Sequence, residues 1–471
     1  MGRIGDTLRL PGRGARAVVT VLVVLALAAG LGSAVSLTAP TLVQRLGLTE
    51  PVVVDVPPEP VPVLGPLPAN APLPTRAGLS TVLDDAADDM PGEFSGTVVD
   101  PAGGAVLWER DPGVPLVPGS TTKILTASAA LLTLDPTAGF VTSVVAGEQP
   151  GTVVLVGGGD PTLTALPDGR LGTYPTPTRL TELAAEVRAA MPGPVEEVLI
   201  DTSRYEGEPL APSWDRSDVT DGFVTPILPL MLDGGRVDPT LQDGRRTTEP
   251  AIEAGEALAE LLDADPADVA EGTAPADAER LGSVTSAPFA ELVEHVMRSS
   301  DNVLAETLAR EVAIVRGSPP TFAGAAEATL AALTQANFDP TGTVLVDGSG
   351  LSTDDVVPAR LLGTLLGAAA APAEGETDTE FLRPMISGLP VAGGDGTLDD
   401  RFAADTGSAA GRGTVRAKTG TLSGVSSLAG VVTDADGRLL VFAFMTNGAS
   451  PAVTRPRLDA MAADLSACGC R

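Results

Sequence analysis

A serine and a lysine stand three positions apart in the stretch PGSTTK at 118–123, directly before the apolar run ILTA. If a helix begins here, Ser120, at its cap or in its first turn, lies on the same face as Lys123, because three residues make about one helical turn. A serine hydroxyl becomes a good nucleophile only when a base removes its proton. A lysine can be that base when burial or a second cation lowers its pKa. The pair therefore indicates covalent catalysis by a serine.

The spacing alone is weak evidence, because a capped helix with a solvated lysine has the same pattern. The basic residues strengthen it: of the 30 lysines and arginines, only Lys123 and Lys418 are lysines. A lysine is compact and can lose its proton near neutral pH, whereas an arginine does neither. The chain thus keeps lysine at two positions, and the second begins the sequence Lys418-Thr419-Gly420.

A polar stretch, Ser300-Asp301-Asn302, separates two segments with helical periodicity at 288–298 and 303–315. A polar loop between two helices exposes its side chains, and such loops often carry functional groups. Three short motifs with chemically capable side chains therefore follow one another along the chain: Ser-x-x-Lys, Ser-Asp-Asn and Lys-Thr-Gly.

The composition excludes several classes of partner. The formal net charge of −31 argues against a nucleic-acid ligand, which needs a basic surface, and against broad adhesion to anionic lipid. We expect this acidity to give a soluble, self-repelling surface. The cysteines, Cys468 and Cys470, and the single histidine, His295, are too few and too far apart in sequence for a metal site. We therefore expect no metal and no other cofactor.

The N-terminal region predicts export. Arginines at positions 3, 9, 13 and 16 precede an apolar run at 17–37 that is long enough to span a bilayer. Residues 1–38 are therefore expected to be a signal peptide or a membrane anchor. Residues 39–78 hold nine prolines between Pro51 and Pro74, which predicts an extended, stiff spacer.

The rest of the chain predicts a mixed α/β (α+β) fold in two parts. Residues 79–141 and 281–471 contain all three motifs, and their last strands, at 414–420, 425–433 and 439–446, read as an antiparallel meander. Between them, residues 142–280 are rich in turns and short strand-like runs. We predict that this stretch is an inserted accessory domain and that the flanking parts form one catalytic domain.

Together the three motifs resemble those of penicillin-binding proteins and class A β-lactamases. The wider sequence resembles the type-4 low-molecular-mass penicillin-binding proteins, the D-alanyl-D-alanine carboxypeptidase/endopeptidase family. The resemblance extends to five further segments, at 158–163, 201–205, 212–214, 347–352 and 396–398. The long gap between the first two motifs is similar to this family, which has an inserted domain, and unlike the short-gap β-lactamases. The resemblance implies a transpeptidase-like, serine β-lactamase-like core, with an antiparallel sheet flanked by helices.

The resemblance also implies the reaction, which is acyl transfer from a peptide ending in D-Ala-D-Ala. Ser120 would form the acyl-enzyme after Lys123 takes its proton, and a nearby Lys418 would help to lower the pKa of Lys123. Ser300 would relay a proton to the departing amine. Asn302 would hydrogen-bond the substrate amide.

The third motif would bind the substrate. Lys418 and Thr419 would hold the terminal carboxylate, and Gly420 would let the substrate backbone lie against the strand. The backbone N–H groups of Ser120 and Thr421 would form the oxyanion hole. Asp301 has no chemical task in this scheme, and we expect it to stabilise its loop.

The inserted domain carries a further expectation. In the family, a segment resembling residues 214–223 lines a subsite for the diamino-acid side chain of the stem peptide. Asp218 would be the partner of the ammonium group there, with Trp214 beside it. The alternative, in which Trp214 is a core residue and Asp218 merely a surface residue, stays open.

The expected function is that of a serine-type D-alanyl-D-alanine carboxypeptidase/endopeptidase, a hydrolase that acts on peptidoglycan stem peptides in the cell wall and is acylated by β-lactams. A β-lactamase is one alternative, although the sequence has no Glu-x-x-Leu-Asn or similar loop to hold a second base. A non-catalytic envelope binding protein of the same fold is the other. Turnover of a D-Ala-D-Ala peptide and of a β-lactam separates the three.

Overall fold

The computed structural model describes residues 70–371 and 379–471. The expected signal peptide or anchor at 1–38, and most of the expected spacer at 39–78, lie outside these residues. Within the described ranges, no helix is long and apolar enough to cross a membrane.

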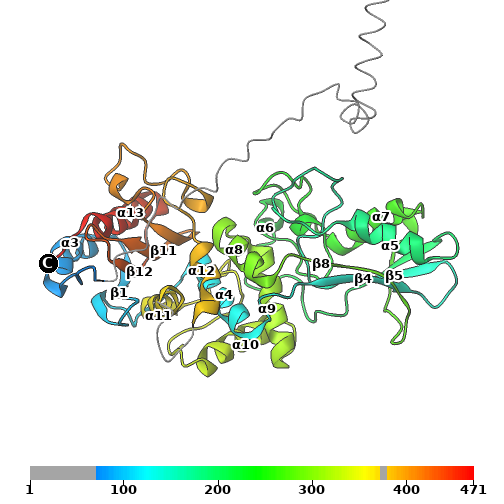
Figure 1. Cartoon of the computed structure of the whole chain (residues 1–471), viewed down its shortest axis with the longest axis horizontal. Coiled ribbons are helices and arrows are strands. Elements are labelled where there is room, and N and C mark those ends of the chain that lie inside the picture. Colours follow the sequence, from blue (N-terminus) through cyan, green and yellow to red (C-terminus); the bar gives the residue numbers. More distant parts are fainter. Residues whose placement is uncertain (1–69, 372–378) are drawn as a thin grey trace, which may run out of the picture. The chain divides into compact units, whose positions relative to one another are not determined.

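Five antiparallel strands form the sheet that carries the third motif, in the order β10-β11-β12-β1-β2 (Figure 1). Their bounds are Glu93–Val99 for β1, Val106–Arg110 for β2, Arg416–Leu422 for β10, Val425–Thr433 for β11 and Leu439–Asn447 for β12. Strand β12 is a nearly continuous apolar run because both of its faces are covered. Val441 and Ala443 belong to one buried core, whereas Phe442 and Phe444 belong to another. The predicted meander is therefore present, with β10 at one edge of the sheet.

Helices cover both faces of this sheet (Figure 1). On one face lie α3, Arg76–Asp88, and α13, Pro451–Ala467, whose apolar side chains share a core with Phe442. On the other face lies α11, Ala359–Ala370, where Leu362 shares a core with Val441. This arrangement confirms the predicted antiparallel sheet flanked by helices.

A group of helices around α4 carries the first two motifs. Their bounds are Lys123–Thr133 for α4, Phe289–Ser299 for α8, Asn302–Arg316 for α9, Phe322–Gln335 for α10 and Pro384–Ser387 for α12. Every residue of α4 from Lys123 to Leu131 is buried, and Leu125 shares a core with Leu304 and Leu308 of α9. The two motifs therefore begin helices whose positions are fixed by packing.

A second sheet, in the order β7-β6-β5-β4-β8, is formed by the predicted insert together with β8, which continues past the predicted boundary at residue 280. Its strands are Val141–Ala146 for β4, Thr152–Val156 for β5, Glu197–Asp201 for β6, Ala270–Glu271 for β7 and Arg280–Thr285 for β8. Helices α5, Leu180–Ala190, and α7, Pro250–Leu261, complete its core. Because β4 pairs with β8, the chain enters and leaves the insert on neighbouring strands. Independent folding of residues 142–280 stays a prediction.

The start and the end of the described chain meet at the edge of α3. The N–H of Thr75 donates to the carbonyl of Cys470 at 2.7 Å, and the Thr75 hydroxyl caps α3 by accepting from the N–H of Gly78. A Cβ atom on Gly78 would lie 2.3 Å from the Cys470 carbonyl oxygen, so glycine is required there. Cys470 is paired with Cys468 in a disulfide. The folded domain thus begins before the predicted boundary at residue 79.

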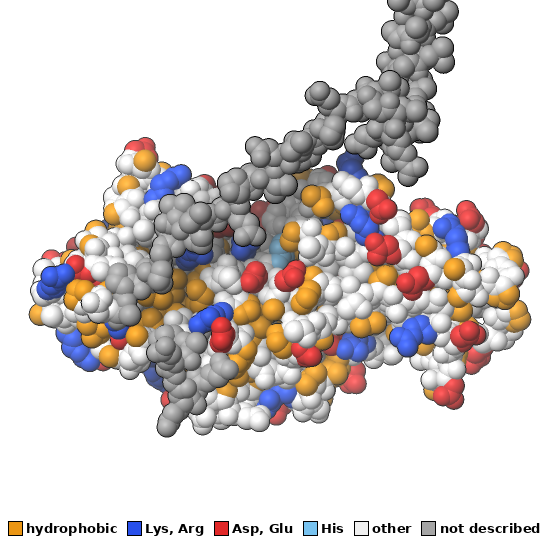
Figure 2. All heavy atoms as spheres, in the orientation of Figure 1, with side chains coloured by type: hydrophobic (Ala, Val, Ile, Leu, Met, Phe, Trp, Pro, Cys, Tyr) orange, Lys and Arg blue, Asp and Glu red, His pale blue; other side chains and the backbone are white. Residues whose placement is uncertain are grey.

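Side chains of both charges are interspersed over the face drawn in Figure 2, with no broad basic patch among the described residues of that face. The absence of a nucleic-acid partner stays a prediction from the net charge of −31.

Candidate active site

Ser120 lies in a short 3-10 turn, Gly119–Thr122, that leads directly into α4. Gly119 has a φ of +54°, and a Cβ atom on it would lie 3.1 Å from the backbone nitrogen of Thr421, so this turn packs tightly against β10. The cap position of α4 is occupied by Thr122, which makes no side-chain capping bond. A capping role for Ser120 is therefore wrong, and its hydroxyl instead contacts Lys123 from the preceding turn.

Lys123 is fully buried and its ammonium nitrogen has three oxygen partners. The nitrogen lies 2.9 Å from Ser120 Oγ, 2.6 Å from Asn302 Oδ1 and 2.6 Å from the carbonyl oxygen of Ser349. Burial lowers the pKa of Lys123 to about 8, although nearby carboxylates, led by Asp347, act in the opposite direction. A substantial fraction of Lys123 is therefore neutral near physiological pH, as a general base requires.

Lys418 is also fully buried, and its nitrogen donates to Ser300 Oγ at 2.7 Å and to the Thr419 carbonyl at 3.0 Å. Burial and then the charge of Lys123 lower the pKa of Lys418 well below its ordinary value. Burial is the largest cause of the lowered pKa of Lys123, and repulsion between the two ammonium groups adds to the lowering at Lys418. That Lys418 helps to lower the pKa of Lys123 stays a prediction.

The Ser300-Asp301-Asn302 loop is a sharp link between α8 and α9. Ser300 has a left-handed backbone, with a φ of +61°, and Asp301 caps α9 by accepting from the N–H of Leu304. Asp301 is also paired with Arg236 of the insert at 2.9 Å, in an ion pair with both side chains fully buried. Burial alone would raise the pKa of Asp301, but Arg236 and Arg246 hold it well below its usual value. These contacts confirm that Asp301 stabilises the loop.

Strand β10 presents an open edge to the site. The N–H of Ala417 donates to the Pro390 carbonyl, outside the pairing with β11. Because backbone direction alternates along a strand, the N–H groups of Thr419 and Thr421 point toward the same edge. The Thr421 N–H therefore points to the free edge of β10, and its nitrogen lies close to the turn that carries Ser120. An oxyanion hole formed with the Ser120 N–H stays a prediction.

Gly420 has a different role from the expected one. A Cβ atom at this position would lie 2.3 Å from the Pro118 carbonyl oxygen and 3.1 Å from the backbone nitrogen of Ser120. The side of the strand that glycine leaves open is therefore filled by the turn that carries Ser120. Gly420 permits close packing of the first motif on the third, and it does not make room for a substrate strand.

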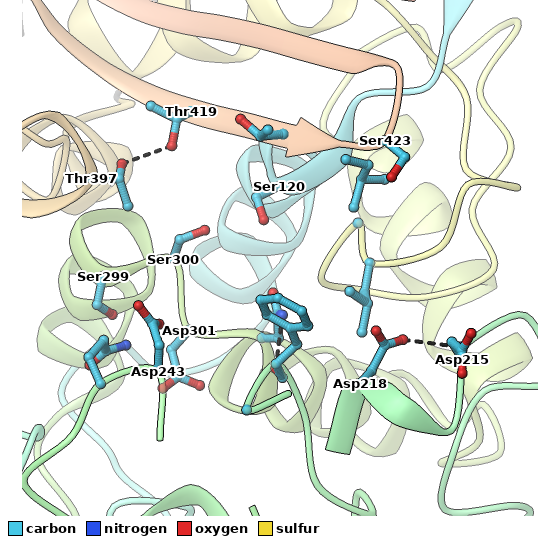
Figure 3. Close-up of a pocket in the computed structure, with 18 of the residues that line it drawn as sticks. Ser120, Asp215, Asp218, Asp243, Ser299, Ser300, Asp301, Thr397, Thr419 and Ser423 are labelled. Atoms are coloured by element: carbon cyan, nitrogen blue, oxygen red, sulfur yellow. Dashed lines mark hydrogen bonds between the residues drawn. The ribbon is translucent and has the colours of Figure 1, made fainter. Parts of the chain in front are cut away.

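A cavity of about 690 Å³ joins these groups. Figure 3 shows the Ser120 and Ser300 side chains beneath the strand that carries Thr419, with Asp218 on the opposite side of the cavity. The predicted residues that line it are Ser120, Ser300, Asn302, Thr419, Thr421 and Asp218. The buried Lys123 and Lys418 lie behind the two serines and act on the cavity through them.

The insert supplies one wall of the cavity, but Trp214 is not part of it. Asp218 lines the cavity, and its carboxylate accepts from the N–H of Asp215 at 3.0 Å. Burial raises the pKa of Asp218, and the negative charges of its neighbours add to the shift. Trp214 is buried, and its indole N–H donates to Asp347 Oδ2 at 2.8 Å. Of the two roles considered for Trp214, the structure therefore supports the core residue.

Two features of the site escaped the sequence analysis. The segment at 347–352 is a turn tied by side chains, in which Asp347 accepts from the N–H groups of Gly350 and Ser352. This turn delivers the Ser349 carbonyl to Lys123. In addition, the Thr397 hydroxyl lies 2.8 Å from that of Thr419 (Figure 3). The glycines next to Ser349 and next to Thr397 were the sequence signal that could have indicated these two features.

The described part of the chain holds no group of His, Cys, Asp and Glu side chains suited to a metal ion. The site places the buried amine of Lys123 in contact with the hydroxyl of Ser120, next to the open edge of strand β10. Such an arrangement can form and break an acyl-enzyme.

Comparison with known proteins agrees with this chemistry. The D-Ala-D-Ala carboxypeptidase 3 (S13) family matches residues 75–246 and 240–467, which is most of the chain. The chain belongs to this family. Membership in the S13 family makes it a serine-type D-Ala-D-Ala carboxypeptidase and confirms the resemblance drawn from the three motifs.

Relatives of known function span nearly the same length. A carboxypeptidase of Mycobacterium tuberculosis is 46% identical over 390 residues, which cover 82% of this chain and 82% of the relative. The carboxypeptidase DacB of Mycolicibacterium smegmatis is 42% identical over 423 residues, covering 88% of this chain and 90% of the relative.

Among solved structures, penicillin-binding protein 4 of Haemophilus influenzae matches with a TM-score of 0.64 at 20% identity, covering 80% of this chain and 97% of its own. At this identity the likeness concerns the fold alone. It confirms the predicted penicillin-binding-protein core of this S13 member.

Proposed function

We propose that this S13 carboxypeptidase removes the terminal D-alanine of peptidoglycan stem peptides through an acyl-enzyme on Ser120. The observation that carries the proposal is the 2.9 Å contact between Ser120 Oγ and the nitrogen of a buried lysine whose pKa is lowered to about 8. A neutral amine at this distance can take the hydroxyl proton as the oxygen attacks the peptide carbonyl.

In the first half of the reaction, the Ser120 oxygen bonds to the carbonyl carbon and its proton passes to Lys123. The negative charge on the carbonyl oxygen faces the N–H groups of Ser120 and Thr421. The C–N bond then breaks, the Ser300 hydroxyl gives its proton to the departing D-alanine amine, and the proton that Lys123 took from Ser120 replaces it. Lys123 is then neutral again for the water step, and the Ser300 hydroxyl keeps its contact with Lys418. Water completes the cycle by hydrolysing the ester on Ser120.

The third motif is proposed to bind the terminal carboxylate. Burial lowers the pKa of Lys418 in the empty site, and a carboxylate arriving beside it would favour its charged form. The Thr419 hydroxyl lines the cavity in front of Lys418 and offers a hydrogen bond to the same carboxylate.

The insert is proposed to hold the diamino-acid side chain of the stem peptide. Asp218 is half-buried on the cavity wall, with a raised pKa, so an ammonium group would relieve its unfavourable charge. Asp218→Asn should weaken turnover of a stem peptide with a free side-chain amine more than turnover of the same peptide with that amine acetylated. Equal losses on both peptides would remove Asp218 from the subsite.

We also propose that residues 1–38 direct export and that the proline-rich residues between them and Thr75 hold the enzyme away from the membrane. The basic, then apolar N-terminal sequence supports export, and the nine prolines between Pro51 and Pro74 support a stiff spacer. An intact mass of the mature protein, with immunoblots of membrane and culture fractions, tests whether the segment is cleaved or retained as an anchor.

Intact-mass spectrometry with penicillin tests the proposed chemistry. A slowly hydrolysed adduct should form on the native protein and be absent from Ser120→Ala, and a D-Ala-D-Ala pentapeptide should release D-alanine only with the native serine. An adduct that persists in Ser120→Ala refutes the assignment of Ser120. Rapid loss of the adduct would indicate a β-lactamase, and binding without any adduct would indicate a non-catalytic protein.

A further inference from the structure

The three partners of the Lys123 nitrogen differ in what they can do with a proton. A neutral amine has two N–H bonds and one lone pair. The Ser349 carbonyl and the Asn302 side-chain oxygen, both at 2.6 Å, can only accept. They therefore take up both N–H bonds, and the lone pair is left to face Ser120 Oγ at 2.9 Å, the one partner that can donate.

This arrangement depends on which end of the Asn302 amide faces the lysine. The amide nitrogen, Nδ2, donates to the backbone carbonyl of Phe223 at 3.0 Å. A carbonyl oxygen can only accept, so the NH₂ end of the amide must face Phe223 and the oxygen end must face Lys123. If the amide were reversed, it would direct N–H bonds at the amine and place two acceptors opposite each other.

The Phe223 carbonyl belongs to the insert and lies in a turn that is fixed by hydrogen bonds. The N–H of Phe223 donates to the Asp218 carbonyl at 2.8 Å, and the carbonyl of the preceding Gly222 accepts from Arg246 Nε at 3.0 Å. Gly222 has a φ of +89°, and a Cβ atom on it would lie 2.7 Å from the carbonyl oxygens of Asp243 and Gly244. The position of the carbonyl is therefore set by the fold of the insert.

We infer that the Phe223 carbonyl directs the lone pair of Lys123 toward Ser120 by fixing the Asn302 amide. The turn at 217–223 is thus a positioning element for acylation as well as a wall of the cavity. The inference rests on the proposed role of Lys123 as the base toward Ser120. Asp218 lies five residues before Phe223 in the same turn. A substrate group bound by Asp218 would therefore contact the turn that orients the lone pair of Lys123.

The charged groups that act on Lys123 come from three segments of the chain. They are Asp347 and Asp355 of the turn after residue 346, Asp301 and Glu306 at the start of α9, and Lys418 of β10. The variants below alter none of these groups. A change in pH dependence therefore reports on the Asn302 contact.

The test is the rate of acylation by a fluorescent penicillin as a function of pH. The rate should rise with pH as Lys123 becomes neutral and reach a plateau. In Gly222→Ala the displaced turn should lower the plateau by about 10²-fold, the cost typical of a misplaced catalytic geometry. The rising limb should move to lower pH, because the lost acceptor stabilises the ammonium form more than the amine. Gly169→Ala, also in the insert at positive φ but with open space around it, should match the native profile.

A second pair of variants retains the fold even if Gly222→Ala does not. The Phe223 side chain is 48% exposed, so its removal leaves the core intact. Phe223→Ala removes the ring, and Phe223→Gly removes the same ring and also frees the backbone. The glycine variant should acylate roughly fivefold more slowly than the alanine variant, which corresponds to about 1 kcal/mol of backbone ordering.

Asn302→Asp tests whether the Phe223 carbonyl acts on Lys123 through the Asn302 side chain. A carboxylate cannot donate to the Phe223 carbonyl, and its charge should move the rising limb to higher pH, opposite to Gly222→Ala. In this background, the difference in acylation rate between Phe223→Gly and Phe223→Ala should vanish, because the hydrogen bond from residue 302 to the Phe223 carbonyl is already lost. Equal rates for the two Phe223 variants in the native background, or a difference that persists in Asn302→Asp, overturns the inference. A native protein that is not acylated at Ser120 refutes the proposed function instead.

Discussion

The two lysines of the site differ in what each must do with a proton. Lys123 must shed its proton to accept one from Ser120, and burial provides for this by lowering its pKa to about 8. Lys418 donates to Ser300 and is proposed to attract a carboxylate, which needs a positive charge. The same residue type therefore serves two opposite electrostatic purposes within one buried site.

Replacement of each lysine by arginine should separate these purposes. Lys123→Arg should lower the acylation rate by roughly 10²–10⁴-fold, the range typical of a lost general base, because arginine stays protonated in proteins. Lys418→Arg should keep part of the activity, with a loss that comes from fitting a larger head group into a fully buried position. The measurement is acylation by a fluorescent penicillin. If Lys123→Arg were still acylated and Lys418→Arg were not, the roles assigned to the two lysines would be reversed.

Thr397 offers a test of carboxylate binding. Its hydroxyl lies 2.8 Å from that of Thr419, so it can orient the Thr419 hydroxyl toward the substrate. Thr397→Val should raise KM for a D-Ala-D-Ala peptide about fivefold, which corresponds to one hydrogen bond of about 1 kcal/mol, with a smaller change in kcat. Thr397→Ser keeps the hydroxyl and should be close to the native enzyme. Equal KM values for the valine and serine variants would contradict this role.

At the scale of elements, the site is assembled where the start of one helix meets the edge of one strand. The turn at 119–122 packs on β10 so closely that glycine is required on both sides, at Gly119 and at Gly420. The second motif is held by a different kind of contact, the buried ion pair between Arg236 of the insert and Asp301. Each motif is therefore positioned by an element distant in sequence.

Gly420→Ala should show how closely these elements fit. The new Cβ atom would come within 2.3 Å of the Pro118 carbonyl oxygen and would displace the turn that carries Ser120. We expect acylation to fall by about 10²-fold and the melting temperature to drop. Gly407→Ala, where no atom lies within 4 Å of the added Cβ, is the control. A native acylation rate in Gly420→Ala would show that the turn tolerates displacement.

At the scale of the whole molecule, every predicted site residue belongs to the described domain, between Ser120 and Thr421. Thr75, directly before α3, bonds to Cys470 near the other end of the described domain. All the groups of the proposed reaction named above therefore come from residues that the structure describes.

A protein that begins at Asn70 should accordingly acylate at the rate of the full chain. The comparison uses the same fluorescent penicillin at one pH, with the melting temperature of each protein as the check on folding. A slower rate in a truncated protein that melts normally would mean that residues before 70 reach the site.

Local sequence determined the identity of the chemical groups and the outline of the fold. The three motifs, the meander at 414–446 and the helices around residues 300–302 could be predicted, because each depends on neighbouring residues and their periodicity. The same reasoning could not place Trp214, whose role depends on Asp347, 133 residues away. It also left Ser120 at the cap or in the first turn, whereas Thr122 occupies the cap of α4 and Ser120 lies in the 3-10 turn before it. The choice depends on how that turn packs against β10.

Only the tertiary structure decided which atoms face one another. The carbonyls of Ser349 and Phe223 help to set the hydrogen bonds of Lys123 and Asn302, yet a backbone carbonyl belongs to every residue and leaves no mark in the sequence. The pKa of Lys123 likewise depends on burial by segments far apart in the chain. The sequence by itself therefore determined that a serine and a lysine act together, and the packing of distant segments decided how the lysine points its lone pair.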